Sequence, residues 1–248
     1  MHQTPSVDAL QMPYEALAAY WLSIGRLTES KRGKSVLAGE IDGTGEPFIR
    51  HVLELMDSGL EHAQVRHLMQ AKRGQRLSSL RTAFGLMRIA LVGIASGENP
   101  RITLVRLAAL FAADPIDETK AMSMAQGVAD SLGTPGTNQS LLLTVDHTQP
   151  PDRLIVKLLF YCLQARRRGK EELHEYLPHR HSPLFGAGLA LVADGFDAAF
   201  LMDFLSRRQA ETLLQARRKM AMSVEMAMAI RKELGYEDVF LIGRSFMP

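Results

Sequence analysis

Residues 183–197 read PLFGAGLALVADGFD and residues 47–61 read PFIRHVLELMDSGLE, and these two stretches decide the fold. Each begins with proline, which is favoured at the first helical position because it has no amide hydrogen to leave unpaired. Apolar side chains at positions 48, 52, 55 and 56 follow the spacing of one helix face. Gly59 and Gly195 then end the two runs, since glycine readily adopts the backbone conformation that closes a helix. Both stretches therefore predict amphipathic helices with defined ends.

The two stretches belong to a longer self-similarity, because the chain aligns with itself without a gap when Gly33 is placed on Gly169. This alignment, the repeat register, gives 12 identities between positions 32 and 94, where about five are expected by chance. The alternative is that any two amphipathic helical stretches can be matched. Matched glycine and proline are harder to obtain by accident than matched leucine, and here Pro47 and Gly59 also meet Pro183 and Gly195. The sequence therefore predicts an internal duplication.

The remaining helices follow from the same reasoning. Helices are expected over Tyr14–Ser30 and Arg153–Arg168, where basic residues and glycine follow the apolar run. A short helix is expected over Lys34–Ile41, and long helices begin near Glu61 and near Asp197, a good N-cap residue.

Alternation with period two is confined to residues 141–145. The predicted fold is all-α, with two tandem similar helical repeats packed together. The first repeat covers residues 1–112, a connector 113–152, and the second repeat 153–248.

The composition is that of a globular protein, with 46% hydrophobic and 23% charged residues. The single cysteine, Cys162, fits a reducing compartment, and residues 1–5 lack the layout of a secretory signal. Charged residues interrupt the apolar stretches before they reach the roughly 20 residues of a membrane span. We expect a cytoplasmic protein without transmembrane helices, and association with a membrane surface stays open.

Several fragments resemble catalytic or metal motifs but lack required parts. Gly33-Lys34-Ser35 has no glycine at the position that a phosphate-binding loop needs. His174, His179 and His181 lie in a polar segment, where histidines are more often solvated than bound to metal. Cys162 lies in an apolar helix, where a buried thiol is inert. No catalytic site, metal or cofactor is expected.

Charge on the first long helix is one-sided. Residues 62–97 contain six basic side chains and no acidic one. Four of the basic residues fall within about 80° of arc at 100° per residue: Arg66, Arg73, Arg81 and Arg88. The stripe is either a solvated face, or a site for an acidic protein surface, or a site for nucleic acid or anionic lipid. The net charge of +2 makes nucleic acid the weaker expectation.

The order of these features resembles the cytoplasmic loop of the flagellar stator A subunit, the MotA/PomA-type family. The resemblance is strongest at residues 189–197, LALVADGFD, and at residues 89–111 around GENPR, which resemble the segment after the last membrane helix of that family. The four membrane helices of the family, and with them ion conduction, have no counterpart here. The family contacts the rotor switch protein through a basic residue three before the loop glycine and an acidic residue five after it. Arg166 matches the first, while His174 stands at the second.

The resemblance implies a non-enzymatic cytoplasmic protein that acts through protein–protein interaction as an assembly or regulatory factor for flagellar motility. Its partner is then an acidic protein surface, with flagellar stator or switch components as candidates. The resemblance implies that the basic turn Arg166, Arg167 and Arg168 also contacts the partner, together with the four arginines of the long helix. The alternative is a helical adaptor or nucleic-acid-binding regulator that uses the basic long helices.

Overall fold

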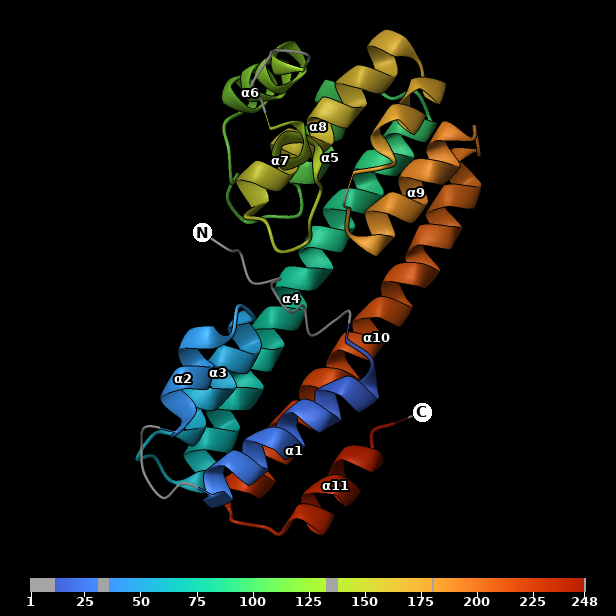
Figure 1. The fold of residues 1–248 in the computed structure, drawn as a ribbon. Helices are drawn as coiled ribbons and strands as arrows, with labels where there is room; N and C mark the ends of the chain where they lie inside the picture. Colours follow the sequence, from blue (N-terminus) through green and yellow to red (C-terminus); the bar gives the residue numbers. More distant parts are fainter. Residues whose placement is uncertain (1–11, 31–35, 133–137, 180, 248) are drawn as a thin grey trace. The chain divides into compact units, whose positions relative to one another are not determined.

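The computed structural model describes residues 12–30, 36–132, 138–179 and 181–247. These residues form helices and the segments between them, and no strand occurs among them (Figure 1). The all-α class is therefore confirmed. The alternating run at 141–145 is no strand, because a short helix covers its first residues.

The helix ends agree closely with the positions of proline, aspartate and glycine in the sequence. Gly169 ends the helix before it with φ 97°, as predicted, while Gly33 lies outside the described residues. Asp197 caps the second long helix by accepting the backbone N–H groups of Ala199 and Phe200 at 2.8 and 2.9 Å. In chain order the helices are α1 (Tyr14–Ser30), α2 (Val36–Gly43), α3 (Pro47–Met56), α4 (His62–Ala95), α5 (Pro100–Ala108), α6 (Glu118–Ser131), α7 (Gln139–Leu143), α8 (Pro151–Arg168), the 3-10 helix η1 (Glu171–Tyr176), α9 (Pro183–Ala193), α10 (Ala198–Arg231) and α11 (Tyr236–Arg244).

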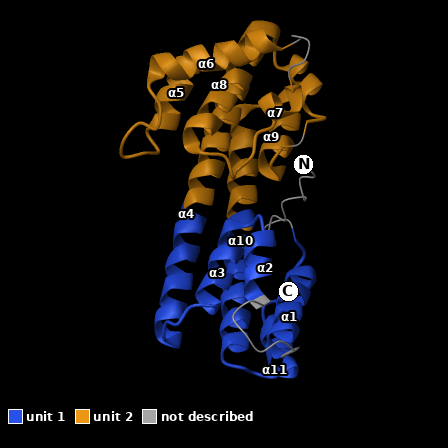
Figure 2. Cartoon of the chain, turned by 60° about the vertical axis from the view of Figure 1, so that its left-hand side comes forward, with its two compact units in different colours: residues 1–78, 212–248 blue, residues 79–211 orange. Residues whose placement is uncertain are grey.

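The chain divides into two compact units (Figure 2). Unit 1 comprises residues 1–78 and 212–248, and unit 2 comprises residues 79–211. Both boundaries fall inside a long helix, α4 or α10. The bounds of the two compact units therefore differ from those of the predicted segments, 1–112, 113–152 and 153–248. Each unit contains helices from both of the predicted repeats.

In unit 1, helices from the two ends of the chain share a core. The α1 side chains Leu17 and Trp21 are fully buried, and α1 packs against α11. Glycine permits two close approaches here. A Cβ at Gly25 would lie 3.5 Å from Ile230, and one at Gly243 would lie 3.0 Å from Met226.

The core of unit 2 is built from another set of helices. Here α8 packs against α5, and the second half of α4 contributes buried side chains such as Phe84 and Leu91. The predicted connector is more regular than expected. It contains α6 and α7, and α6 packs against α8 through the buried Ala121 and Ala125.

The two long helices agree in length and in the way they end. Each has 34 residues and the helix after it has nine, and the bounds of all four helices agree with the repeat register. At the end of α4, the N–H groups of Gly97 and Glu98 donate to the carbonyls of Ile94 and Gly93. At the end of α10, Glu233 and Leu234 donate in the same way to Ile230 and Ala229. Gly97 and Glu233 both have positive φ angles, 68° and 59°, as in the Schellman motif that closes a helix.

One helix, α4, is long and apolar enough to cross a membrane by length and composition alone. Within the described part of the chain it alone meets this test, and 61% of its most apolar window is buried inside the protein. Core helices of globular proteins meet the same test, so α4 is only weak support for a membrane span.

Gly188 of α9 offers a test of the packing in unit 2. A Cβ at Gly188 would lie 2.5 Å from Leu91 and 3.0 Å from Leu205, both of which are fully buried. We expect Gly188→Ala to lower the free energy of unfolding by about 1–3 kcal/mol through overpacking. Gly186→Ala on the same helix is the matched control, since its Cβ would meet only His181 at 3.7 Å. It should be neutral or stabilising by up to about 1 kcal/mol. Equal effects of the two changes in chemical denaturation would contradict this packing.

Candidate protein-interaction surfaces

The predicted arginine stripe on α4 is not a uniform exposed surface. In unit 1, Arg66 donates from Nη1 to both carboxylate oxygens of Glu225 on α10, at 2.5 and 2.8 Å. The Arg66 and Glu225 side chains are 37% and 34% exposed. The acid that is missing from α4 is therefore supplied by α10, so the charge of Arg66 is compensated within unit 1. Arg73, also in unit 1, is half-buried.

In unit 2, the two remaining arginines of the stripe differ from each other. Arg88 is half-buried and donates from Nη1 to the hydroxyl of Ser206 at 3.0 Å. Arg81 is exposed, and its backbone carbonyl accepts from the amide of Gln209 at 3.4 Å. Arg81 is therefore exposed, whereas Arg66, Arg73 and Arg88 are half-buried.

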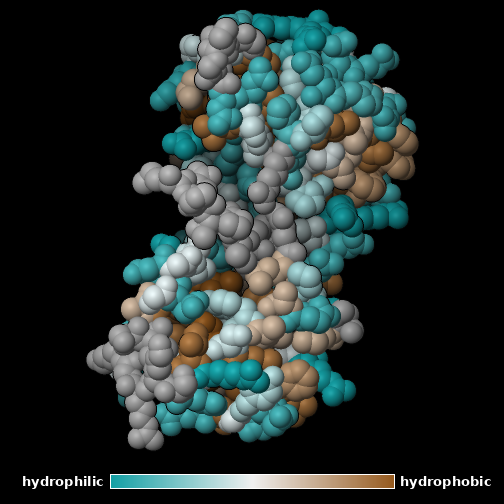
Figure 3. Space-filling model, viewed as in Figure 1, coloured by the Kyte–Doolittle hydropathy of each residue, from teal (hydrophilic) through white to brown (hydrophobic). Residues whose placement is uncertain are grey.

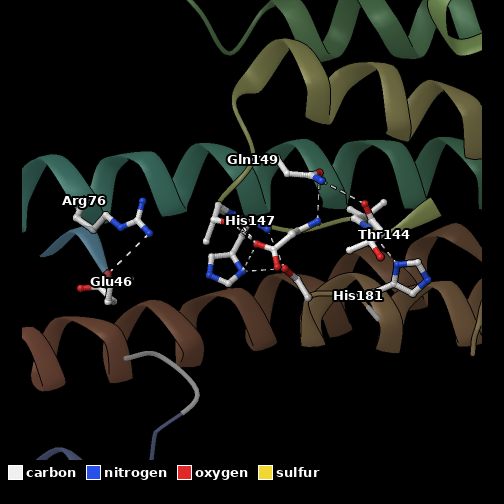
Figure 4. Close-up of polar contacts among 10 residues, drawn as sticks. Glu46, Arg76, Thr144, His147, Gln149 and His181 are labelled. Carbon is white, nitrogen blue, oxygen red and sulfur yellow. Dashed lines mark hydrogen bonds and ion pairs between the residues drawn. The ribbon is translucent and has the colours of Figure 1, made fainter. Parts of the chain in front are cut away.

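A further arginine of α4, Arg76, lies near an N-cap in unit 1. Its guanidinium is 3.9 Å from Glu46 (Figure 4). Glu46 is buried and accepts the backbone N–H of Ile49 at 2.6 Å, which caps the first turn of α3. This contact is structural, because the carboxylate satisfies a helix N–H group that has no partner within the helix.

The basic turn at the end of α8 is exposed, as expected for Arg166, Arg167 and Arg168. Arg168 forms ion pairs with Glu172 and Glu175, both at 3.0 Å, and these acids raise the pKa of its guanidinium. Arg166 reaches the carbonyl of Gly97 at 3.5 Å. For Arg167, no ion pair or hydrogen bond occurs with the described part of the chain, so it is the member most open to a partner.

The three histidines that were considered for a metal do not converge. His174 contacts Asp194 at 2.9 Å, whereas His181 lies inside a separate network. The N–H of Val145 donates to His181 Nδ1 at 3.2 Å, and Nε2 lies 2.9 Å from the carbonyl of Tyr176. His181 is therefore a neutral imidazole that donates from Nε2. Within the described ranges, no three His, Cys, Asp or Glu side chains gather as a metal site requires.

This network fixes the segment between α7 and α8 against the start of α9. Figure 4 shows His181 beside Thr144, with Gln149 and His147 on the same segment. Ser182 donates its N–H to the carbonyl of Val145 at 2.8 Å, and its hydroxyl lies 2.7 Å from His147 Nδ1. Both His147 and Ser182 are buried, so their contact is shielded from solvent and stabilises the loop.

Cys162 is buried, as predicted. Burial raises the pKa of its thiol to about 12, with a smaller contribution from the negative charge of Glu98. A thiol with this pKa is a poor nucleophile near neutral pH, because the thiolate is the reactive form.

An exposed aromatic surface, which was not predicted from the sequence, lies at the start of α10. Phe196 and Phe200 are 42% and 45% exposed, and their rings stack with centroids 5.0 Å apart. Phe200 stacks in turn on the half-buried Phe204, at 6.3 Å and an interplanar angle of 13°. We call Phe196, Phe200 and Phe204 the Phe stripe. In Figure 3, apolar side chains are visible over this end of α10, at the right-hand edge of the view.

Unit 1 has an apolar surface at the equivalent positions of α4. Leu60 and Leu68 are 40% and 39% exposed and correspond to Phe196 and Phe204 in the repeat register. Together with Ala63, Gln64 and His67 they line a shallow depression. We call these five residues the Leu stripe. The apolar spacing i, i+4, i+8 was the available signal for the Phe stripe, but in the sequence it is indistinguishable from a core face.

Unit 1 also contains a cavity of about 420 Å³ among α1, α11 and the end of α10. The guanidinium of Arg26 lies 4.6 Å from the ring centroid of Tyr236 at its edge. The lining includes two arginines and two glutamates, Arg26, Arg231, Glu29 and Glu233. The balance of charge favours neither an anion nor a cation.

Comparisons of the chain with protein-family models, with curated proteins and with solved structures found no match.

The ion pair between Arg66 and Glu225 predicts an asymmetry between two arginines of α4. Arg66→Glu should lower the free energy of unfolding by about 1 kcal/mol, because it places two carboxylates together in a partly exposed pair. Adding Glu225→Arg in the same chain should recover most of this loss. Arg73→Glu is the control and should change stability by no more than about 0.5 kcal/mol. Equal losses for Arg66→Glu and Arg73→Glu in urea denaturation would show that the pair contributes nothing.

His181 predicts a pH dependence of stability. Burial, as the largest cause, lowers the pKa of His181 below its usual 6.5. The stabilising contribution is therefore present above pH 6.5 and is lost as the pH falls from 6.5 through the folded-state pKa. The slope for this one proton is at most about 1.4 kcal/mol per pH unit. His181→Gln should show a shallower decline between pH 7 and 5 in urea denaturation, and identical slopes would contradict the assignment. The raised pKa of His174 makes stability change with pH in the opposite direction. This contribution is the same in wild type and in His181→Gln, so it cancels when their slopes are compared.

Proposed function

We propose that the chain acts by binding a protein partner through the Phe stripe and the Leu stripe, and not by catalysis. The observation that carries this proposal is the exposure of Phe196 and Phe200 at the start of α10 and of Leu60 and Leu68 at the start of α4. Contiguous exposed apolar side chains rimmed by polar residues are typical of protein-binding surfaces. Aromatic residues are also enriched at such interfaces because they supply much contact area with few rotatable bonds.

We further propose that the chain arose by duplication of a five-helix unit. The support is that α4 and α10, α5 and α11, and the hydrogen bonds that close both long helices all keep the repeat register. The pairing of α1 with α11 and of α8 with α5 follows the same correspondence. Under this proposal the two stripes are copies of one ancestral surface, and the inserted α6 and α7 are the part that only one copy has.

The biological setting that we propose is assembly or regulation of the flagellar motor in the cytoplasm. Its support is the sequence resemblance at residues 189–197 and 89–111 to the MotA/PomA-type cytoplasmic region. The exposed Arg166 and Arg167 are candidates for a secondary contact, because positive charge steers an acidic surface toward the protein. Nucleic acid is the second candidate partner, and steep loss of affinity for DNA or RNA with added salt would identify it.

A deletion and rescue experiment tests this function. We expect cells that lack the gene to keep their filaments but to lose swimming. Wild-type protein should restore swimming, whereas Phe200→Glu should not, because it places a charge in the middle of the Phe stripe. Met202→Glu is the matched control, since Met202 is a 36% exposed apolar residue on another face of the same helix. Co-purification with stator or switch components should fall in parallel for Phe200→Glu.

Two results would contradict the proposal. Normal swimming after deletion would remove the motility role. Full rescue by Phe200→Glu, with expression equal to that of Met202→Glu, would show that the Phe stripe is not the binding surface.

A further inference from the structure

One histidine of unit 2, His174 of η1, links this helix to the end of α9. Its Nε2 lies 2.9 Å from a carboxylate oxygen of Asp194, and its Nδ1 lies 2.8 Å from the backbone carbonyl oxygen of Glu171. A carbonyl oxygen and an ionised carboxylate can only accept hydrogen bonds. Both ring nitrogens must therefore donate, and only the protonated imidazolium carries a proton on each of them. We call these two contacts the His174 bridge, which is complete only when His174 is charged.

The position of Asp194 gives the His174 bridge a structural effect. Asp194 is the C-cap residue of α9, where the last carbonyl groups form the negative end of the helix dipole. A carboxylate is unfavourable at this end of a helix, and a cation is favourable. Protonated His174 therefore stabilises the end of α9, whereas neutral His174 leaves the Asp194 carboxylate unpaired at the negative end of the dipole.

The cations near the His174 bridge do not replace it. η1 packs against α8 and α9, and α9 carries no charged residue before Asp194. Residues 166–170 include four cations, but none of them pairs with Asp194 in the described part of the chain. Three of the four are engaged elsewhere: Arg166 with the carbonyl of Gly97, Arg168 with Glu172 and Glu175, and Lys170 with the carbonyl of Ala95. On α10, Arg207 and Arg208 pair with Asp203 and Glu211.

The pH determines how much of the His174 bridge is present. The hydrogen bond to the carbonyl of Glu171, followed by the hydrogen bond to Asp194, raises the pKa of His174 above its usual 6.5. The negative charges of the same two residues act in the same direction. The stabilising contribution is therefore fully present below pH 6.5 and is lost as the pH rises through the folded-state pKa.

The hydrogen bonds that close α9 connect Asp194 to the Phe stripe. The N–H of Gly195 donates to the carbonyl of Val192 at 3.1 Å, and the N–H of Phe196 donates to that of Leu191 at 3.0 Å. Phe196 is the first ring of the Phe stripe and follows Asp194 by two residues. Weakening the end of α9 therefore loosens the backbone that positions Phe196.

We propose that His174 is a pH-sensitive switch that, when protonated, fixes the turn between α9 and α10 and so orders Phe196 for binding. This inference rests on the proposed function, because it names a regulation of the Phe stripe. Affinity for the partner falls as the pH rises, since a mobile side chain has to be ordered when the complex forms. The first repeat lacks this device, because Ala38 and Ser58 take the places of His174 and Asp194 in the repeat register.

An NMR titration of His174 in the full chain tests whether Asp194 sets its protonation. The midpoint in wild type should lie above pH 6.5, and Asp194→Asn should lower it toward 6.5 because the negative partner is removed. Asp203→Asn is the matched control, since Asp203 pairs with Arg207 instead, and it should leave the midpoint unchanged. Equal midpoints in wild type and Asp194→Asn would overturn the inference.

Amide hydrogen exchange at Gly195 and Phe196 measures the turn itself. After correction for the intrinsic pH dependence of exchange, protection in wild type should fall about twofold or more between about pH 6 and 8. His174→Gln should be poorly protected at both pH values, whereas His174→Arg keeps a cation at this position and should be protected at both. Constant protection in wild type, or equal protection in the two variants, would overturn the inference.

These results are separable from the outcome of the swimming assay. If the titration and the exchange behave as expected but Phe200→Glu restores swimming, the switch is present and its role in binding is overturned together with the proposed function. If exchange in wild type is constant with pH and Phe200→Glu fails to restore swimming, the binding function stands and its control by pH is overturned.

Discussion

Burial of α1 and α8 against helices that lie far away in the sequence is the packing on which both compact units depend. Leu17 and Trp21 of α1 are covered in a unit that also contains α11 and the end of α10. In unit 2, α8 is covered by α5 and α6. Fully burying a large apolar side chain contributes about 1.5–3 kcal/mol, and no single predicted repeat contains all the helices of one such core. Both units therefore require the two long helices to form, since α4 and α10 each contribute to both.

Because α4 and α10 each contribute to both cores, one face of each long helix has to be buried. Val65 and Met69 of α4, and Leu201 and Leu205 of α10, are fully buried at equivalent positions. The residues beside them, Leu68 and Phe204, lie at the edge of these faces and are only partly covered. The apolar surface of each long helix is thus wider than its core needs. The excess is what remains exposed as the two stripes.

The helices and their ends could be predicted from the sequence because the signals are local. Proline at position 47, glycine at 169 and aspartate at 197 each act within one turn of the helix that they begin or end. The pairing between helices could not be predicted in this way. The acid that compensates Arg66 is 159 residues away at Glu225, and nothing near either residue indicates the other. The exposure of the two stripes could not be predicted either, because it also depends on helices that are distant in the sequence. An apolar residue at helical spacing is assigned to the core unless the position of the neighbouring helix is known.

The two units differ in chemistry at positions that are paired in the repeat register. In unit 2, Glu98 accepts from Thr103 at 2.7 Å and from Arg106 at 3.0 Å, and a Cβ at Gly93 would lie 2.8 Å from the Thr103 hydroxyl. At the corresponding positions unit 1 has Leu234, Val239 and Ile242, with Ala229 in place of the glycine. The polar triad of unit 2 needs the missing Cβ at Gly93 to bring Thr103 close, whereas the apolar set of unit 1 has no such need. Each unit has therefore been adjusted internally around its own set of residues.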